Sequence, residues 1–72
     1  MEYLVVRFLR SRRVRIDEKF NGRTGELIEL EAGTHVISLG PPHDTYAPEQ
    51  FTIVLQDTSE LAPHEINFDL KV

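Results

Sequence analysis

The sequence predicts an all-β fold, a small antiparallel β-sandwich of about six strands that occupies residues 1–72 as a single domain. Three observations favour this fold. Apolar and polar side chains alternate with a period of two over most of the chain, glycine and proline separate the alternating stretches, and no useful length of amphipathic helix appears. A chain this short buries only about 60% of its unfolded surface, so we expect a modest core.

The first two strands are expected in the stretches 2–9 and 13–20, where β-branched and aromatic residues alternate with polar ones. If these strands form a hairpin, the apolar residues fix the register because they must share one face. A loop of residues 10–12 places Phe8 opposite Val14, whereas a loop one residue shorter would place Phe8 opposite an arginine. The sequence therefore predicts the three-residue loop.

This register has an electrostatic cost, because it places Arg7 opposite Arg15 on the solvent face, and like charges across a strand pair destabilise it. We therefore expect carboxylates close to these arginines, supplied either by the acidic part of the same chain or by a partner. A solvated arginine face without a partner is the alternative.

A turn is expected at residues 20–25, because Asn21-Gly22 tolerates the positive φ angles of a tight reversal and Gly25 offers a second such position. A glycine-rich phosphate-binding loop is the functional alternative. It is disfavoured because no helical pattern follows to supply a helix N-terminus. The glycines are therefore interpreted as turn residues.

Residues 26–30 and 34–39 predict two further strands, joined by a turn at Ala32-Gly33. Pairing these strands places His35 on the apolar face of the sheet. A histidine in such a position is more often a hydrogen-bonded core residue than a metal or substrate ligand, so we expect His35 to have a structural role.

The segment 40–49 is expected to be irregular, because its three prolines are incompatible with a central strand or a helix. Loops of this length in small domains are often functional. His43 and Tyr46 would then offer aromatic side chains with polar tips to a partner. The alternative is that Tyr46 folds back and closes one end of the sandwich.

The last two strands are expected within the stretches 50–57 and 65–72, with residues 58–64 as the connector. Both stretches alternate between apolar and polar residues, and short connections suit antiparallel pairing. The side chains expected to face inward are Phe51, Ile53, Leu55, Ile66, Phe68 and Leu70.

The charges are unevenly distributed along the chain. The net charge is −4, but residues 1–25 carry a net +4 and the remaining residues a net −8. Glu29 and Glu31 form an acidic row on an exterior face that could complement the arginines. Such a dipolar chain can neutralise itself within the fold or pair head to tail with a second copy.

The composition also bears on compartment and chemistry. The chain has no cysteine, which is compatible with a reducing compartment, and its first residues are too soon charged for a signal peptide or a membrane span. We therefore expect a soluble cytoplasmic protein. No catalytic or cofactor signature is present, and the three histidines are too far apart in the sequence to suggest a metal site. We expect no enzyme activity, cofactor or metal.

The order of turn residues and strands over about residues 13–56 resembles that of the PEGA domain, a short bacterial and archaeal β module. The similar segments are 14–17, 22–24, 30–37 and 46–48, which hold an aspartate after a strand, a Gly-x-Thr turn, a glycine followed by a histidine, and a tyrosine. Ala32 stands where the PEGA pattern often has proline. The resemblance implies a transthyretin-like β-sandwich that serves as a non-catalytic module, usually within larger envelope or signalling proteins.

These observations favour a non-catalytic structural or protein-interaction module, which binds another protein or a second copy of itself. Nucleic acid or another polyanion bound through the Arg7–Arg15 hairpin is one alternative, and a carbohydrate or small ligand is another. The candidate interaction residues are Arg7, Arg10, Arg12, Arg13, Arg15, His43 and Tyr46.

Overall fold

The computed structural model describes residues 1–71, except for the side chain of His43, and within these residues it confirms the all-β class. No helix among the described residues is long and apolar enough to cross a membrane. The strands are β1 (Glu2–Arg7), β2 (Arg13–Ile16), β3 (Lys19–Arg23), β4 (Leu27–Leu30), β5 (Gly33–Leu39), β6 (Tyr46–Ala47), β7 (Phe51–Leu55), β8 (His64–Asn67) and β9 (Asp69–Leu70), with a 3₁₀ turn, η1, at His43–Thr45.

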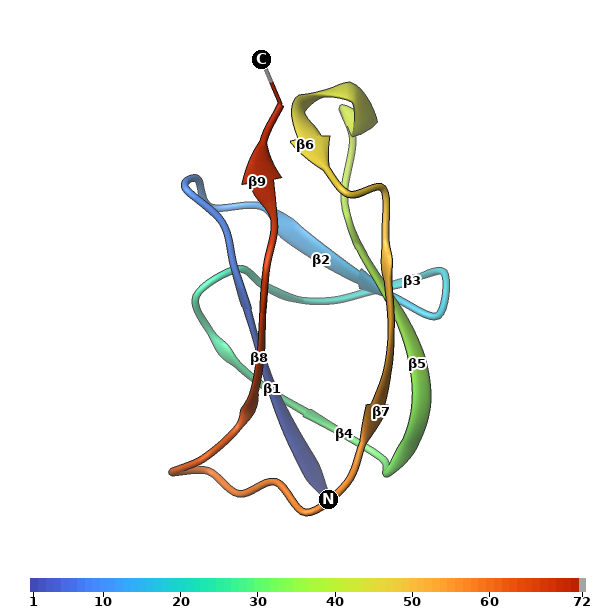
Figure 1. Ribbon diagram of the computed structural model, residues 1–72, viewed down its shortest axis with the longest axis vertical. Helices are drawn as coiled ribbons and strands as arrows, with labels where there is room; N and C mark the ends of the chain where they lie inside the picture. Colours follow the sequence, from blue (N-terminus) through green and yellow to red (C-terminus); the bar gives the residue numbers. More distant parts are fainter. Residues whose placement is uncertain (72) are drawn as a thin grey trace.

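The strands form a sandwich of two main sheets (Figure 1). One sheet has the order β4-β1-β8 and the other the order β3-β2-β5-β7, while β6 and β9 pair separately at one end. The pairs are antiparallel except for β1 with β8, which is parallel, so the prediction of a wholly antiparallel fold is wrong at this pair. Strand β1 is therefore the centre of its sheet, with a partner along each edge.

The predicted hairpin between residues 2–9 and 13–20 does not form, because β1 and β2 belong to different sheets. Residues 8–12 carry the chain from one sheet across to the other. Val6 and Val14 are nevertheless both fully buried, because the two sheets face each other across one core. Alternation thus predicted the inward face of each strand correctly, but facing sheets satisfy the same pattern as a hairpin does.

The predicted pairing of residues 26–30 with 34–39 is wrong for the same reason. Strand β4 pairs with β1, with Leu30 opposite Glu2, whereas β5 pairs with β2 and β7. Gly33, at a φ of 125°, begins β5 where the chain passes between the sheets, so the glycine marks a crossing and not a hairpin turn.

The turn expected at residues 20–25 is confirmed only at Gly25, which lies between β3 and β4 at a φ of 82°, whereas the reversal expected at Asn21-Gly22 lies four residues earlier. Asp17 and Glu18, with φ angles of 50° and 70°, form a two-residue turn between β2 and β3, and Asn21 lies within β3. Non-glycine residues seldom adopt such angles, so a compensating contact is needed. Asp17 has one, because its backbone N–H donates to the carbonyl oxygen of Val36 at 2.9 Å and its carboxylate accepts from the Val36 N–H at 2.9 Å.

The core lies between the two sheets and is closed at one end by aromatic rings. Ile53 and Leu55 are buried as expected, Phe51 packs against the core, and Ile66 and Phe68 are buried. Leu70 is 38% exposed, so its predicted inward position is wrong. The strand predicted at 65–72 is divided at Phe68 into β8 and β9. The Phe68 N–H donates to the carbonyl oxygen of Arg7, and the chain beyond it leaves the main sheet as β9 to pair with β6.

Gly22 tests how closely β3 packs against β4. A methyl group at Gly22 would lie 2.8 Å from Cγ1 of Ile28, whereas one at Gly25 would meet nothing within 4 Å, and both glycines have φ near +80°. We expect Gly25→Ala to lower the free energy of unfolding by about 1 kcal/mol through backbone strain alone. Gly22→Ala should lose about 1–3 kcal/mol more through overpacking. Equal losses in urea titrations would contradict the packing described for Gly22.

Candidate interaction surface

Arg12 is the most extensively bonded of the predicted arginines, and it is half-buried. Its guanidinium donates to the carbonyl oxygens of Gly40 and Pro42 and to Oγ1 of Thr45, the last two at 3.0 and 2.9 Å. Its Cζ atom also lies 5.7 Å from the ring centroid of Tyr46, within cation–π range. Arg12 therefore fixes the segment before β6 against residues 8–12.

Tyr46 belongs to the core, so its prediction as an interaction residue is wrong and the alternative holds. Its side chain is 2% exposed, and its hydroxyl donates to the carbonyl oxygen of Leu39 at 2.9 Å. Its ring makes edge-to-face contacts with Phe8 and Phe68, at centroid distances of 6.3 and 5.4 Å. Burial of a tyrosine with its hydroxyl bonded closes this end of the sandwich.

Arg7 has the carboxylate partner expected from the same chain, although on an unexpected strand. Its Nε donates to Oε1 of Glu65, on the neighbouring strand β8, at 2.5 Å. Arg15 is not opposite Arg7 but lies on β2, opposite Ser38 and Phe20. The predicted like-charge pair thus does not exist, because its two members lie in different sheets.

The other candidate interaction residues make fewer contacts with side chains of the same chain. Arg13 stacks on the ring of Phe20, with Cζ 3.8 Å from the ring centroid, and Arg10 is exposed. Within residues 1–71, no arginine other than Arg7 forms an ion pair with a carboxylate. The side chain of His43 lies outside the part of the chain that the structure describes.

An open groove of about 640 Å³ lies where residues 10–12, the Pro41-Pro42 segment and β9 meet. Its lining carries three positive charges and no carboxylate, together with a partly exposed leucine. We call this surface the basic groove; the residues that define it are Arg10, Arg12, Pro41, Pro42, Leu70 and Lys71. It combines charge with apolar contact area, which is the composition that protein partners use.

Of the residues that define the basic groove, the sequence analysis predicted only Arg10 and Arg12 as interaction residues. Leu70 and Lys71 were missed, because period-two alternation was extended through Phe68 and assigned Leu70 to the core. The loop containing Pro41 was predicted to interact, but through His43 and Tyr46. The break at Phe68 has no proline or glycine to mark it in the sequence, so no local signal could have revealed it.

The opposite end of the molecule is acidic. Glu29 lies directly across the strand pair from Tyr3, and the Tyr3 hydroxyl donates to Oε1 of Glu60 at 3.4 Å. Partial burial, with the negative charges of Glu29, Glu60 and Glu2, raises the pKa of the Tyr3 phenol. In Figure 1 the start of β1 and the β7–β8 connection lie at the bottom, and β6 and β9 lie at the top. Glu2, Glu29 and Glu60 therefore lie near the end of the domain opposite to β6 and β9, whereas η1 and β9 at the other end each contain one aspartate, Asp44 and Asp69.

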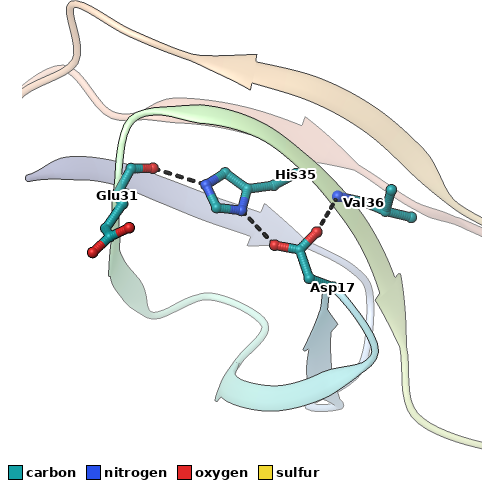
Figure 2. A network of polar contacts seen from close by, with 4 residues as sticks. All are labelled: Asp17, Glu31, His35 and Val36. Carbon is teal, nitrogen blue, oxygen red and sulfur yellow. Dashed lines mark hydrogen bonds and ion pairs between the residues drawn. The ribbon is translucent and has the colours of Figure 1, made fainter.

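A second polar cluster joins the β2–β3 turn to β5 (Figure 2). Nδ1 of His35 lies 2.6 Å from Oδ2 of Asp17, and its Nε2 lies 2.8 Å from the carbonyl oxygen of Glu31. Both partners are acceptors, so both ring nitrogens carry a proton when the two bonds are complete. This confirms the interpretation of His35 as a hydrogen-bonded structural residue with no nitrogen left for a ligand.

Titration of this cluster follows from these contacts. Burial alone would lower the pKa of His35, but the Glu31 carbonyl and the Asp17 carboxylate together raise it above its ordinary value. The Val36 N–H and the His35 ring lower the pKa of Asp17. The arrangement stabilises a charged pair. It offers no poised acid or base beside a cavity, and the described residues contain no group of three or more potential metal ligands.

Comparisons with known proteins give no relative: no family model, no curated protein and no solved structure matches this chain.

The pH dependence of stability tests the His35–Asp17 pair. The raised His35 pKa contributes stability that is complete below about pH 6.5 and is lost as the pH rises through the folded-state value. The lowered Asp17 pKa contributes stability that is present above about pH 4 and is lost as the pH falls through its folded-state value. Both contributions are therefore complete between these limits, and each declines beyond one of them.

We therefore expect Asp17→Asn, which keeps a residue that tolerates positive φ, to destabilise by about 1 kcal/mol at about pH 5.5. The loss should be smaller at about pH 8.5, because the stability that comes from the raised pKa of His35 is lost as the pH rises through that pKa. Urea unfolding of both proteins at the two pH values measures this difference, in which the other titrating groups cancel. A loss that is the same at both pH values would contradict the charged pair.

Proposed function

We propose that this chain is a non-catalytic protein-interaction module, and that the basic groove binds an acidic segment of a protein chain that also carries an apolar side chain. The observation that carries the proposal is the lining of the groove, in which three cations that have no carboxylate partner within residues 1–71 lie together with the partly exposed Leu70. Cations alone would suit any polyanion, but an apolar side chain within the groove favours a protein segment.

Arg10 and Arg12 have different roles in the groove, and this difference supports the same proposal. Arg12 is held by loop oxygen atoms and gives the groove its shape, whereas Arg10 is exposed and free to meet a carboxylate. A groove with one fixed and two adjustable cations can bind carboxylates without a large ordering cost for the wall itself. Single-stranded nucleic acid would instead need exposed aromatic rings for stacking. Tyr46 is buried, and the ring of Phe20, which is exposed, already has the Arg13 guanidinium stacked on it.

The resemblance to the PEGA domain belongs to this proposal. The residues that carry it have structural roles: Asp17 and His35 form the polar cluster, and Tyr46 closes the core. Oγ1 of Thr24 accepts from the Arg12 N–H at 3.0 Å and donates to the carbonyl of Arg10 at 2.9 Å. Because the motif residues stabilise the fold, we expect the choice of partner to depend on surface residues outside the motif. A cytoplasmic location, suggested by the cysteine-free composition, is also part of the proposal.

Fluorescence anisotropy with a labelled peptide of alternating glutamate and leucine tests this function. We expect binding that weakens as salt is added, and a loss of about tenfold or more in Arg10→Glu/Lys71→Glu, because both adjustable cations are reversed. Lys19→Glu, which reverses an exposed cation on β3, is the matched control and should bind like the parent.

The comparison ligands are an all-glutamate peptide and oligothymidine, both of which we expect to bind more weakly than the mixed peptide. Tighter binding of oligothymidine would replace the proposal with nucleic-acid binding. Equal affinity of the parent and the doubly reversed variant would show that the basic groove is not the site.

A further inference from the structure

The acidic end carries an apolar side chain on a preformed turn. Ser59 and Ala62 exchange backbone hydrogen bonds, at 3.2 Å from the Ser59 N–H and 3.1 Å from the Ala62 N–H, so Glu60 and Leu61 form the tip. The Ala62 N–H also approaches Oγ of Ser59 at 3.0 Å. Leu61 is 98% exposed, more than any other large apolar residue among residues 1–71. Such exposure of a leucine on a closed turn presents an apolar side chain at little conformational cost.

The turn is also tied to the body of the domain. The N–H and hydroxyl of Thr58 donate to Oε1 of Glu2 at 2.9 and 2.6 Å, and the hydroxyl accepts from the Tyr3 N–H at 2.7 Å. These bonds hold the pKa of Glu2 below its usual value, so the carboxylate stays charged. The tip therefore stands on a fixed base beside Glu2, among the negative charges of the acidic end.

We propose that the partner of the basic groove is a second copy of this chain, whose Glu60-Leu61 tip docks there. This inference rests on the proposed function and names its partner. Leu61 would contact Leu70 in the groove, while Glu60 would lie near Arg10 and Lys71. The tip has an acidic side chain next to an apolar one, and the groove lining has cations next to a leucine. The two surfaces are therefore complementary in charge and in apolar contact.

The positions of the two surfaces determine the type of assembly. The tip lies in the β7–β8 connection at the bottom of Figure 1 and the groove beside β9 at the top. A contact between opposite ends is heterologous, so every docked copy leaves one free tip and one free groove, and chains can grow. Symmetric pairing through two basic or two acidic ends would bring like charges together.

The size of the contact limits its strength. The domain measures 34 × 21 × 16 Å, so an end face cannot bury the roughly 800 Å² per partner of a standard stable interface. Association should therefore be weak, with a dissociation constant on the order of 0.1 mM, and strongly reduced by salt. Attachment of several copies to a common scaffold would strengthen it by raising the local concentration.

Sedimentation of the whole chain at about 1 mM protein and low salt tests the proposal, with variants that block each surface separately. We expect the parent to form species larger than dimers. Leu61→Ser, which removes the tip, and Arg10→Glu/Lys71→Glu, which reverses the groove, should each be monomeric alone. An equimolar mixture of these two should form a dimer and nothing larger, because one variant keeps the groove and the other keeps the tip.

Two controls separate this mode from other forms of association. Val54→Thr changes an exposed apolar residue on the edge strand β7, and we expect it to assemble like the parent. Loss of assembly in Val54→Thr with full assembly in Leu61→Ser would overturn the proposal in favour of pairing through the edge of β7. A circular dichroism spectrum identical to that of the parent confirms that each variant is folded.

The outcome also separates this inference from the function on which it rests. A parent chain that stays monomeric at about 1 mM, yet still binds the glutamate–leucine peptide through the basic groove, would overturn self-association and leave the proposed function intact. Assembly of the mixture into species as large as those of the parent would contradict head-to-tail docking, since blocked chains cannot extend.

Discussion

The fold depends on how Arg12 joins two segments that cross between the main sheets, residues 8–12 and 24–26, to the segment that precedes β6. Its backbone N–H donates to Oγ1 of Thr24, and its carbonyl oxygen accepts from the Thr24 N–H at 2.9 Å. Its guanidinium binds the carbonyls of Gly40 and Pro42, beside the Tyr46 ring. A small domain without a disulfide needs such a contact, because its core alone gives limited stability. The same contacts form one wall of the basic groove.

The sequence predicted the faces of the strands better than their partners. Leu4, Val6 and Ile53 point inward as period-two alternation requires. Pairing was wrong because facing sheets around one core give the same pattern as hairpins, and only long-range hydrogen bonds distinguish them. The turn at Asp17-Glu18 was missed because its stabilising bonds come from Val36 on a distant strand, whereas Asn21-Gly22 fits the local rules for turns.

The candidate surface was predicted in part. The concentration of arginines identified Arg10 and Arg12, and the net charges of the two chain segments indicated a dipole. The sequence could not show that the Arg12 guanidinium donates its hydrogen bonds to loop oxygen atoms. It also could not show that Leu70 and Lys71 lie beside Arg12, because their positions depend on β9 leaving the main sheet to pair with β6. His35 and Tyr46, which belong to the motif, stabilise the fold through their own hydrogen bonds, and neither lines the groove.

The two ends of this domain are proposed to be complementary, with the Glu60-Leu61 tip at one end and the basic groove at the other. A spin label tests this claim directly, because the chain has no cysteine and Ala62→Cys places one label beside the intact tip. Labelled chains are mixed with ¹⁵N-labelled parent chains, and the broadening of amide signals is measured. Broadening confined to residues 10–12, 43–45 and 70–71 is the result expected for head-to-tail docking. Broadening centred on residues 58–63 of the ¹⁵N chain, or none at all, would contradict the claim.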